Sequence, residues 1–120
     1  MKGCRVLLAE DNLLNREIAV ELLSSNGAVV DTTENGQECL ERFLASAPGE
    51  YQIILLHVRM PVMNGYEATR RIRSCGRADA VVIPILAVTA DAFSEDIQAA
   101  REAGMNGHIS KPLDMVKKRI

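Results

Sequence analysis

Short apolar runs recur along the chain and are separated by segments of helical periodicity. Five runs predict β-strands, at residues 4–9, 28–32, 52–57, 81–89 and 107–110. Pro84 lies inside the fourth run. Because proline has no N–H to donate to a ladder, we expect pairing there to be interrupted or to start late.

The segments between the runs predict helices. Apolar residues recur at helical spacing in the first two, as Leu14, Ile18 and Leu22, and as Leu40, Phe43 and Leu44 on an inner face. Asn26-Gly27 predicts the end of the first helix, and Asn35-Gly36 the start of the second. Further helices are expected at about residues 65–74, from Ser94 to Gly104, and from Pro112 onward, where the last helix is cut short at residue 120.

Five strand–helix repeats predict one α/β domain over residues 1–120, a doubly wound, five-stranded parallel sheet with helices on both faces. Ligands of such sheets bind beyond the carboxyl ends of the strands. The polar residues expected at that edge are Glu10-Asp11, Thr32 or Thr33, His57, Thr89 and Ser110-Lys111. Two acids, a hydroxyl, a lysine and a histidine could therefore converge at the middle strands.

Charge and composition narrow the possible functions. Lys and Arg total 14 against 16 Asp and Glu, a net charge of -2, which argues against general nucleic-acid binding. The basic clusters at residues 70–73 and 117–119 are interpreted as solvated helix faces. Three separated cysteines favour reduced thiols, and no apolar run approaches the roughly 20 residues of a membrane helix. With no leader-like segment, we expect a cytoplasmic location.

The polar residues at the strand ends suggest two interpretations. Glu10 and Asp11 could hold a hard cation such as Mg²⁺, while Thr89 and Lys111 hold a phosphoryl group. Alternatively, the two acids only cap the first helix and pair with Lys111. Neither a Walker loop nor a GxGxxG motif is present, so nucleotide binding has no support.

Four stretches resemble, in order, the receiver domain of two-component signalling, which is found in response regulators and hybrid sensor histidine kinases. They are "LLAEDNLLNREIAVELL", "MPVMNGYEATRRIR", "ILAVTADA" and "AGMNGHISKPL". The resemblance extends from about Cys4 to Val116, and Asn12 with Asn15 is a pattern common in hybrid-kinase receivers. It implies a flavodoxin-like strand order 2-1-3-4-5.

In that family the third strand ends in an aspartate, which attacks the phosphorus of a phosphohistidine donor and forms an acyl phosphate. The resemblance implies that Glu10, Asp11 and the backbone carbonyl of Arg59 bind Mg²⁺, and that Thr89 and Lys111 hold the phosphoryl oxygens. It further implies a regulatory domain, not an enzyme. The expected partner is a histidine kinase, a histidine-phosphotransfer protein or another domain of the parent protein.

His57 stands where the family has its aspartate, and no acidic residue lies between Glu50 and Glu67 to replace it. Imidazole is a poor ligand for Mg²⁺ and a better one for Zn²⁺, Ni²⁺ or Cu²⁺, so we expect a weakened Mg²⁺ site. Lys111 is expected to turn toward the two acids. These acids are expected to outweigh burial and keep the imidazole partly protonated at neutral pH.

Three functions fit these residues. The one we favour is a degenerate receiver that keeps its fold as a protein-protein interaction module, with phosphorylation lost or reduced. The second is a receiver that still accepts phosphate, either on a nitrogen of His57 or on Asp11. An aspartate replaced artificially belongs to this second reading. The third is a small transition-metal site built from Glu10, Asp11 and His57.

The resemblance also implies a switch and partner surfaces. The fifth strand of receivers often carries a Phe or Tyr that turns inward on phosphorylation, and His108 occupies that position. Thr89 and His108 would form the switch pair, or His108 would be a partly exposed ring without a role. A partner or a second copy in a homodimer would bind at about residues 94–119. Residues 13–25 would face a histidine-phosphotransfer protein.

Overall fold

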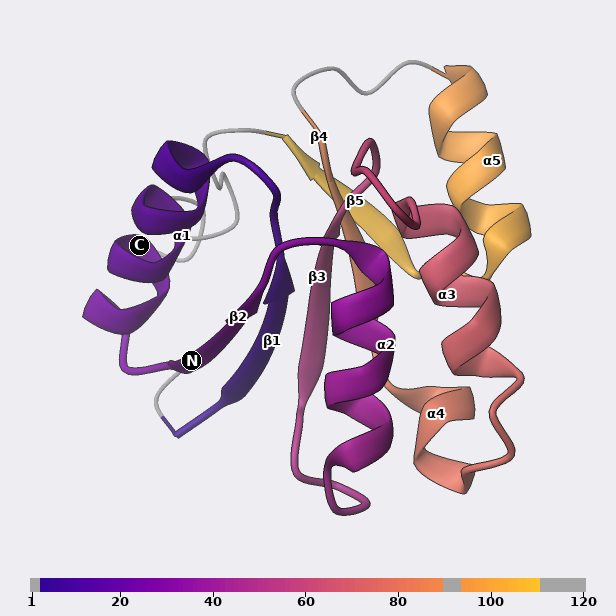
Figure 1. The fold of residues 1–120 in the computed structure, drawn as a ribbon, viewed down its shortest axis with the longest axis horizontal. Coiled ribbons are helices and arrows are strands. Elements are labelled where there is room, and N and C mark those ends of the chain that lie inside the picture. The colour runs from indigo at the N-terminus through magenta and orange to yellow at the C-terminus, as the bar shows by residue number, and fades with distance from the viewer. Residues whose placement is uncertain (1–2, 90–93, 111–120) are drawn as a thin grey trace.

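The computed structural model describes residues 3–89 and 94–110, and within them five parallel strands form one sheet in the order β2-β1-β3-β4-β5 (Figure 1). The strands are β1 (Arg5–Ala9), β2 (Val29–Thr33), β3 (Ile53–His57), β4 (Ile85–Thr89) and β5 (Gly107–Ser110). The helices are α1 (Leu13–Ser25), α2 (Gly36–Ala45), α3 (Gly65–Arg73), α4 (Ala78–Val82) and α5 (Ser94–Ala103). The predicted strand order is confirmed, whereas the helix expected from Pro112 lies outside the described residues.

Helices cover both faces of the sheet, as predicted (Figure 1). Alternate residues of β1 point to opposite faces, so that Leu7 packs in a cluster with Phe43 of α2 and Ile72 of α3. Leu8 packs on the other face with residues of α1. In the part of the chain that the structure describes, no helix has both the length and the apolar character needed to cross a membrane.

The buried side of α1 does not follow the spacing of its apolar residues. Leu14 and Ile18 are exposed, Leu14 by 64 %, and the fully buried residues of the helix are Ala19 and Leu23. Apolar residues occur on nearly every side of α1, because Leu13, Leu14 and Ile18 lie outside the buried stripe. The periodic pattern therefore predicted the helix but does not mark its buried side, since of Leu14, Ile18 and Leu22 only Leu22 is partly buried against the core.

The inner face of α2 was predicted in part. Leu40 and Phe43 are buried as expected, but Leu44 is exposed and Cys39 takes the core position instead. Complete burial raises the pKa of the Cys39 thiol to about 12, so this cysteine behaves as a small apolar residue. The three cysteines are all free, which agrees with the prediction of reduced thiols.

The fourth predicted strand was too long at its amino end. Val81 and Val82 belong to the short helix α4, and β4 begins at Ile85, directly after Pro84. The late start after proline is confirmed, and the strand assignment before it is wrong. A short apolar run does not distinguish a strand from a helical turn, and both valines are exposed on α4.

The basic cluster on α3 is only partly a solvated face. Arg70 and Arg71 are exposed and pair with Glu67, at 3.3 and 2.8 Å. Arg73 is half-buried and was interpreted wrongly, because its guanidinium joins α3 to α4 and to the turn after α5. It donates to the carbonyl oxygens of Ala80, Ile83 and Gly104 at 2.7–3.0 Å.

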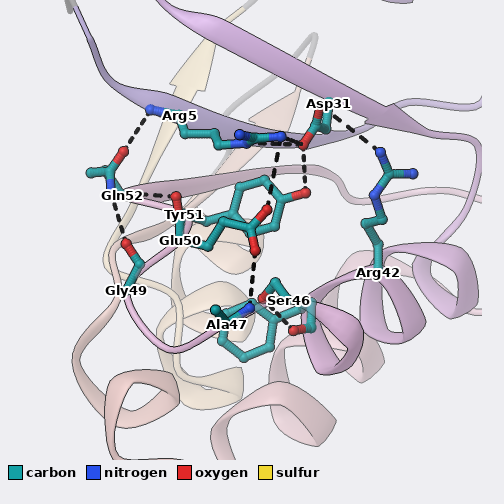
Figure 2. A network of polar contacts seen from close by, with 10 residues as sticks. Arg5, Asp31, Arg42, Ser46, Ala47, Gly49, Glu50, Tyr51 and Gln52 are labelled. Atoms are coloured by element: carbon teal, nitrogen blue, oxygen red, sulfur yellow. Dashed lines mark hydrogen bonds and ion pairs between the residues drawn. The ribbon is translucent and has the colours of Figure 1, made fainter.

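A polar network joins the sheet to α2, and Asp31 lies at its centre (Figure 2). Asp31 Oδ2 accepts hydrogen bonds from Tyr51 Oη at 2.6 Å and from Arg5 Nη2 at 3.1 Å. Arg42 of α2 lies 3.9 Å from the other carboxylate oxygen, and Glu50 lies 3.8 Å from Arg5. This Asp31 network (Arg5, Asp31, Arg42, Glu50 and Tyr51) links β1, β2, α2 and the segment just before β3.

Candidate functional site

Two acids follow β1 at the carboxyl edge of the sheet. The Glu10 N–H donates to the carbonyl of Thr33 at 3.1 Å, which continues the pairing one residue past the strand. Glu10 is 3 % exposed, and its Oε2 accepts a hydrogen bond from the N–H of Asn12 at 3.1 Å. Asn12 in turn caps α1 through its side chain. Strand end and helix start therefore hold Glu10 in place, while Asp11 is more exposed.

His57 ends β3 beside these acids. Ala9 pairs with Leu56, so His57 lies level with Glu10 in the sheet. Its Nδ1 atom is 3.2 Å from Glu10 Oε2 and 3.1 Å from Asp11 Oδ1. Ionised carboxylates only accept hydrogen bonds, so with both acids ionised Nδ1 is the donor and its hydrogen lies between them. The imidazole thus occupies the space next to both carboxylates.

The loop after β3 requires its glycine. The start of α3 approaches the end of β3 so closely that a Cβ on Gly65 would lie 2.7 Å from the carbonyl oxygen of His57. The Gly65 N–H donates to the carbonyl oxygen of Val58 at 2.9 Å, and this hydrogen bond closes the loop.

Within this loop Val62 has a φ of 69°, which is rare for a β-branched residue. The Met63 N–H donates to the carbonyl oxygen of Pro61, so that residues 61–63 form a tight γ-turn with Val62 at its centre.

Other predicted site residues lie at the same edge or outside the described residues. Val88 pairs with His57, so Thr89 follows one residue further along β4, where its backbone pairs with Ser110. The side chain of Thr89 and all of Lys111 lie outside the described part of the chain. Arg59 is an exposed residue of the loop after β3, and the role of its carbonyl as a metal ligand stays a prediction.

The predicted switch residue His108 lies away from the acids. It is an exposed residue of β5, opposite Ala87 of β4. It lines a cavity of about 320 Å³ together with Arg101 and Met105, at the side of the sheet where α5 packs. Its role as a rotamer switch with Thr89 stays a prediction.

Two residues that support the site were missed by the sequence reasoning. Arg16 of α1 donates to the backbone carbonyl of Glu10 at 2.9 Å, and the N–H of Asn12 orients the Glu10 side chain. The Asn12 cap could have been found from the sequence, because asparagine before a helical segment is a common cap. The Arg16 contact depends on the turn between β1 and α1, which no spacing rule describes.

The order of the strands and the site at their carboxyl edge define a receiver domain. The chain belongs to the response regulator receiver domain family, whose model matches residues 6–118. It is 42% identical over 118 residues to the two-component response regulator ORR41 of Oryza sativa subsp. japonica, covering 97% of this chain and 89% of that protein. It is 34% identical over 125 residues to "Probable histidine kinase 2" of Oryza sativa subsp. indica, where the match covers 95% of this chain but 12% of the kinase.

Solved structures agree with this assignment. The receiver domain of sensor histidine kinase PA1611 from Pseudomonas aeruginosa superposes with a TM-score of 0.84 at 32% identity, covering 98% of this chain and 92% of that one. Its crystal structure holds a magnesium ion coordinated in the active site cleft. The receiver of Ssk1, solved with the phosphotransfer protein Ypd1 of Saccharomyces cerevisiae, gives a TM-score of 0.82 at 25% identity, covering 98% of this chain and 85% of that one.

The side chains of this chain do not suit Mg²⁺ as well as three oxygen ligands would. Mg²⁺ prefers oxygen ligands in near-ideal octahedral geometry, and imidazole nitrogen is a poor ligand for it. Here Glu10 and Asp11 supply oxygens, but the third group beside them is the Nδ1 atom of His57. This set of ligand atoms is the reason for expecting a weakened Mg²⁺ site, which stays a prediction.

Proposed function

We propose that this chain is a degenerate receiver domain, which serves a two-component phosphorelay as a protein-protein interaction module and not as an ordinary phosphoacceptor. The observation that carries this proposal is the position of His57. Its Nδ1 atom lies within 3.2 Å of both acids at the end of β3, where the family has its reactive aspartate. The domain then regulates by binding and catalyses no reaction of its own.

The chemistry of the site supports a loss of phosphorylation. An imidazole offers no carboxylate oxygen to form an acyl phosphate, and Nδ1 is engaged by both acids. The Mg²⁺ that would neutralise the incoming phosphoryl group has a weaker set of ligands. Phosphate transfer to the nitrogen of His57 or to Asp11 is the alternative, and the experiment below separates it from the proposal.

The exposed apolar residues of α1 support a binding role. Leu13, Leu14 and Ile18, here called the apolar surface of α1, are exposed on the helix that begins two residues after Asp11. The complex of Ssk1 with Ypd1 is a precedent for a receiver that binds a histidine-phosphotransfer protein. We place such a partner on α1, and a histidine kinase, another domain of a longer protein or a second copy of the chain on the surface around α5 and β5.

Phosphorylation by a small donor tests the proposal. The unsubstituted protein and the His57→Asp and His57→Ala variants are incubated with acetyl phosphate and Mg²⁺, and their intact masses are measured. We expect only His57→Asp to gain one phosphate, because it restores the carboxylate beside Glu10 and Asp11. The His57→Ala variant separates the missing carboxylate from blockage by the imidazole.

A phosphate on the unsubstituted protein would overturn the proposal. The acid lability of that adduct would then distinguish a phosphorylated nitrogen of His57 from a phosphorylated carboxylate. Loss of the adduct in Asp11→Asn would assign it to Asp11. Circular dichroism of each variant shows whether the fold is kept, so that an unfolded protein is not mistaken for an unreactive one.

A further inference from the structure

We propose that Glu10, Asp11 and His57 form a binding site for one divalent transition-metal ion, with Zn²⁺ as the ion that fits best and Ni²⁺ and Cu²⁺ as related ligands. The three side chains offer one ligand atom each, and these atoms lie within 4.8 Å of one another. They come from two neighbouring strand ends, so the fold itself brings them together.

The distances suit a tetrahedral ion. Zinc bonds of about 2.0–2.1 Å place neighbouring ligand atoms about 3.3–3.4 Å apart. The Nδ1 atom of His57 lies 3.2 Å from Glu10 Oε2 and 3.1 Å from Asp11 Oδ1, close to that spacing. The two carboxylates are no more than 4.8 Å apart, and a small rotation of Asp11 brings them into range. An ion would take the place of the hydrogen on Nδ1: a protonated imidazole releases that proton to solvent, and a neutral imidazole carries its hydrogen on Nε2 instead.

The ligand atoms select the class of metal. Zinc binds both imidazole nitrogen and carboxylate oxygen, and zinc sites with three protein ligands keep a fourth position for water. Imidazole binds Zn²⁺, Ni²⁺ and Cu²⁺ well, whereas Mg²⁺ and Ca²⁺ prefer oxygen alone. Replacing the family's aspartate by His57 therefore changes the preferred ion instead of only weakening the site.

The surroundings hold the ligands ready and leave a path for the ion. Glu10 is almost fully buried and oriented by the N–H of Asn12, a supporting contact of the kind that raises metal affinity. The side chains of His57 and Asp11 are 21 % and 33 % exposed. Solvent and a metal ion can therefore reach the site from one side without unfolding it.

This inference rests on the proposed function, because it names a ligand that would set the state of the interaction module in place of phosphate. A bound ion would tie the loop after β1 to the end of β3. Any ion that binds only the folded state also stabilises it by mass action. The ion would therefore stiffen the edge of the sheet next to the apolar surface of α1.

Titration calorimetry with ZnCl₂ and with MgCl₂, in a reducing buffer without chelators, tests the site. We expect one Zn²⁺ per chain, bound at least about a hundredfold more tightly than Mg²⁺. His57→Ala should weaken Zn²⁺ binding at least about tenfold, since even supporting residues cost that much. Asp11→Ala should weaken Zn²⁺ binding by a similar factor, and because Asp11 is exposed we expect this substitution to leave the fold unchanged. His57→Asp should narrow the difference in affinity between Zn²⁺ and Mg²⁺, because Mg²⁺ gains a third oxygen ligand.

Two matched controls remove other sources of zinc binding. His108→Ala replaces the only other histidine and should leave the affinity unchanged. A variant with both Cys4→Ser and Cys75→Ser replaces the two half-buried thiols and should also bind as before.

Zinc affinity that stays within twofold in both His57→Ala and Asp11→Ala would overturn the metal site. So would its loss in either control. Neither result affects the acetyl phosphate experiment, which contains no zinc. A phosphate on the unsubstituted protein would overturn the proposed function. The zinc titration would still test the metal site, because its outcome depends only on Glu10, Asp11 and His57.

Discussion

Replacing Tyr51 by phenylalanine removes one hydroxyl from the Asp31 network and leaves the packed ring in place. The Tyr51 ring is 5 % exposed, so a phenylalanine ring of the same shape keeps its packing. The hydroxyl lies 2.6 Å from Asp31 Oδ2, the short distance of a hydrogen bond to an ionised acceptor (Figure 2). The variant therefore isolates one charge-assisted hydrogen bond.

The magnitude follows from what remains around the carboxylate. Hydrogen bonds to charged groups contribute about 1.5–3 kcal/mol, and the side chain of Asp31 is 16 % exposed. Arg5 still donates to the same oxygen through Nε at 3.2 Å and Nη2 at 3.1 Å, so the carboxylate is not left without partners. We therefore expect the low end, a loss of about 1.5 kcal/mol in the free energy of unfolding. For a domain of this size the melting temperature should fall by about 6 °C.

The loss depends on pH in a defined direction. The Tyr51 hydroxyl is the main cause that lowers the pKa of Asp31 below its ordinary value of 3.8, and Arg5 adds to it while burial opposes it. Because the folded pKa is the lower one, the stabilisation is present above the unfolded value and is lost as pH falls through the folded value. The deficit of Tyr51→Phe should therefore be complete at pH 7 and shrink below about pH 4.

Urea unfolding followed by circular dichroism at pH 7, 5 and 3.5 measures this effect, with equal m-values as the sign that only stability changed. Asp31→Asn provides the partner for a double-mutant cycle, in which Tyr51→Phe should cost about 1 kcal/mol less than in the unsubstituted protein. A deficit under about 0.5 kcal/mol at pH 7, or one that is equal at all three pH values, would refute the reasoning.

Three further substitutions probe other parts of the structure. Gly65→Ala would place a Cβ 2.7 Å from the carbonyl oxygen of His57 and should lower the free energy of unfolding by about 1–3 kcal/mol in urea titrations; no loss would contradict the close approach of α3. Arg73→Met leaves three carbonyl oxygens without their donor and should cost about 2–3 kcal/mol by the same assay, whereas a neutral result would make this contact incidental. Leu14→Glu should weaken binding of a histidine-phosphotransfer protein at least about tenfold in calorimetry without changing stability. Val81→Glu, equally exposed on α4, is its control, and equal losses in both would argue against a surface on α1.

The pattern of apolar runs was enough to predict the sheet, because parallel strands buried on both faces need continuous apolar residues. The pattern gave the wrong secondary structure where a single apolar run is compatible with either a strand or a helical turn. Val81 and Val82 precede Pro84 in a single apolar stretch, and only the path of the chain from α3 to β4 makes them a helical turn. The exposure of Leu14 was likewise beyond the pattern, since α1 carries apolar residues on too many sides for periodicity to select the buried one.

The contacts of the half-buried Arg73 involve residues that are far apart in the sequence. The charges alone do not distinguish Arg73 from its exposed neighbours, although its position four residues after the buried Thr69 places it on the inner stripe of α3. Its burial depends on carbonyl oxygens that α4 and the turn after α5 bring to it. The same holds for Asp31, whose partners Arg5 and Tyr51 come from the start of β1 and from two residues before β3.

For the site, the sequence by itself determined which groups stand at the carboxyl edge of the sheet, with His57 at the position where the resemblance implies an aspartate. Strand ends in a parallel sheet share one edge, so residue order alone brings Glu10, Asp11 and His57 to it. Only the tertiary structure decided that Nδ1 lies 3.1–3.2 Å from both carboxylates. That spacing depends on strand register, on the cap at Asn12 and on side-chain rotamers, which are set by packing across the sheet and not by any local pattern.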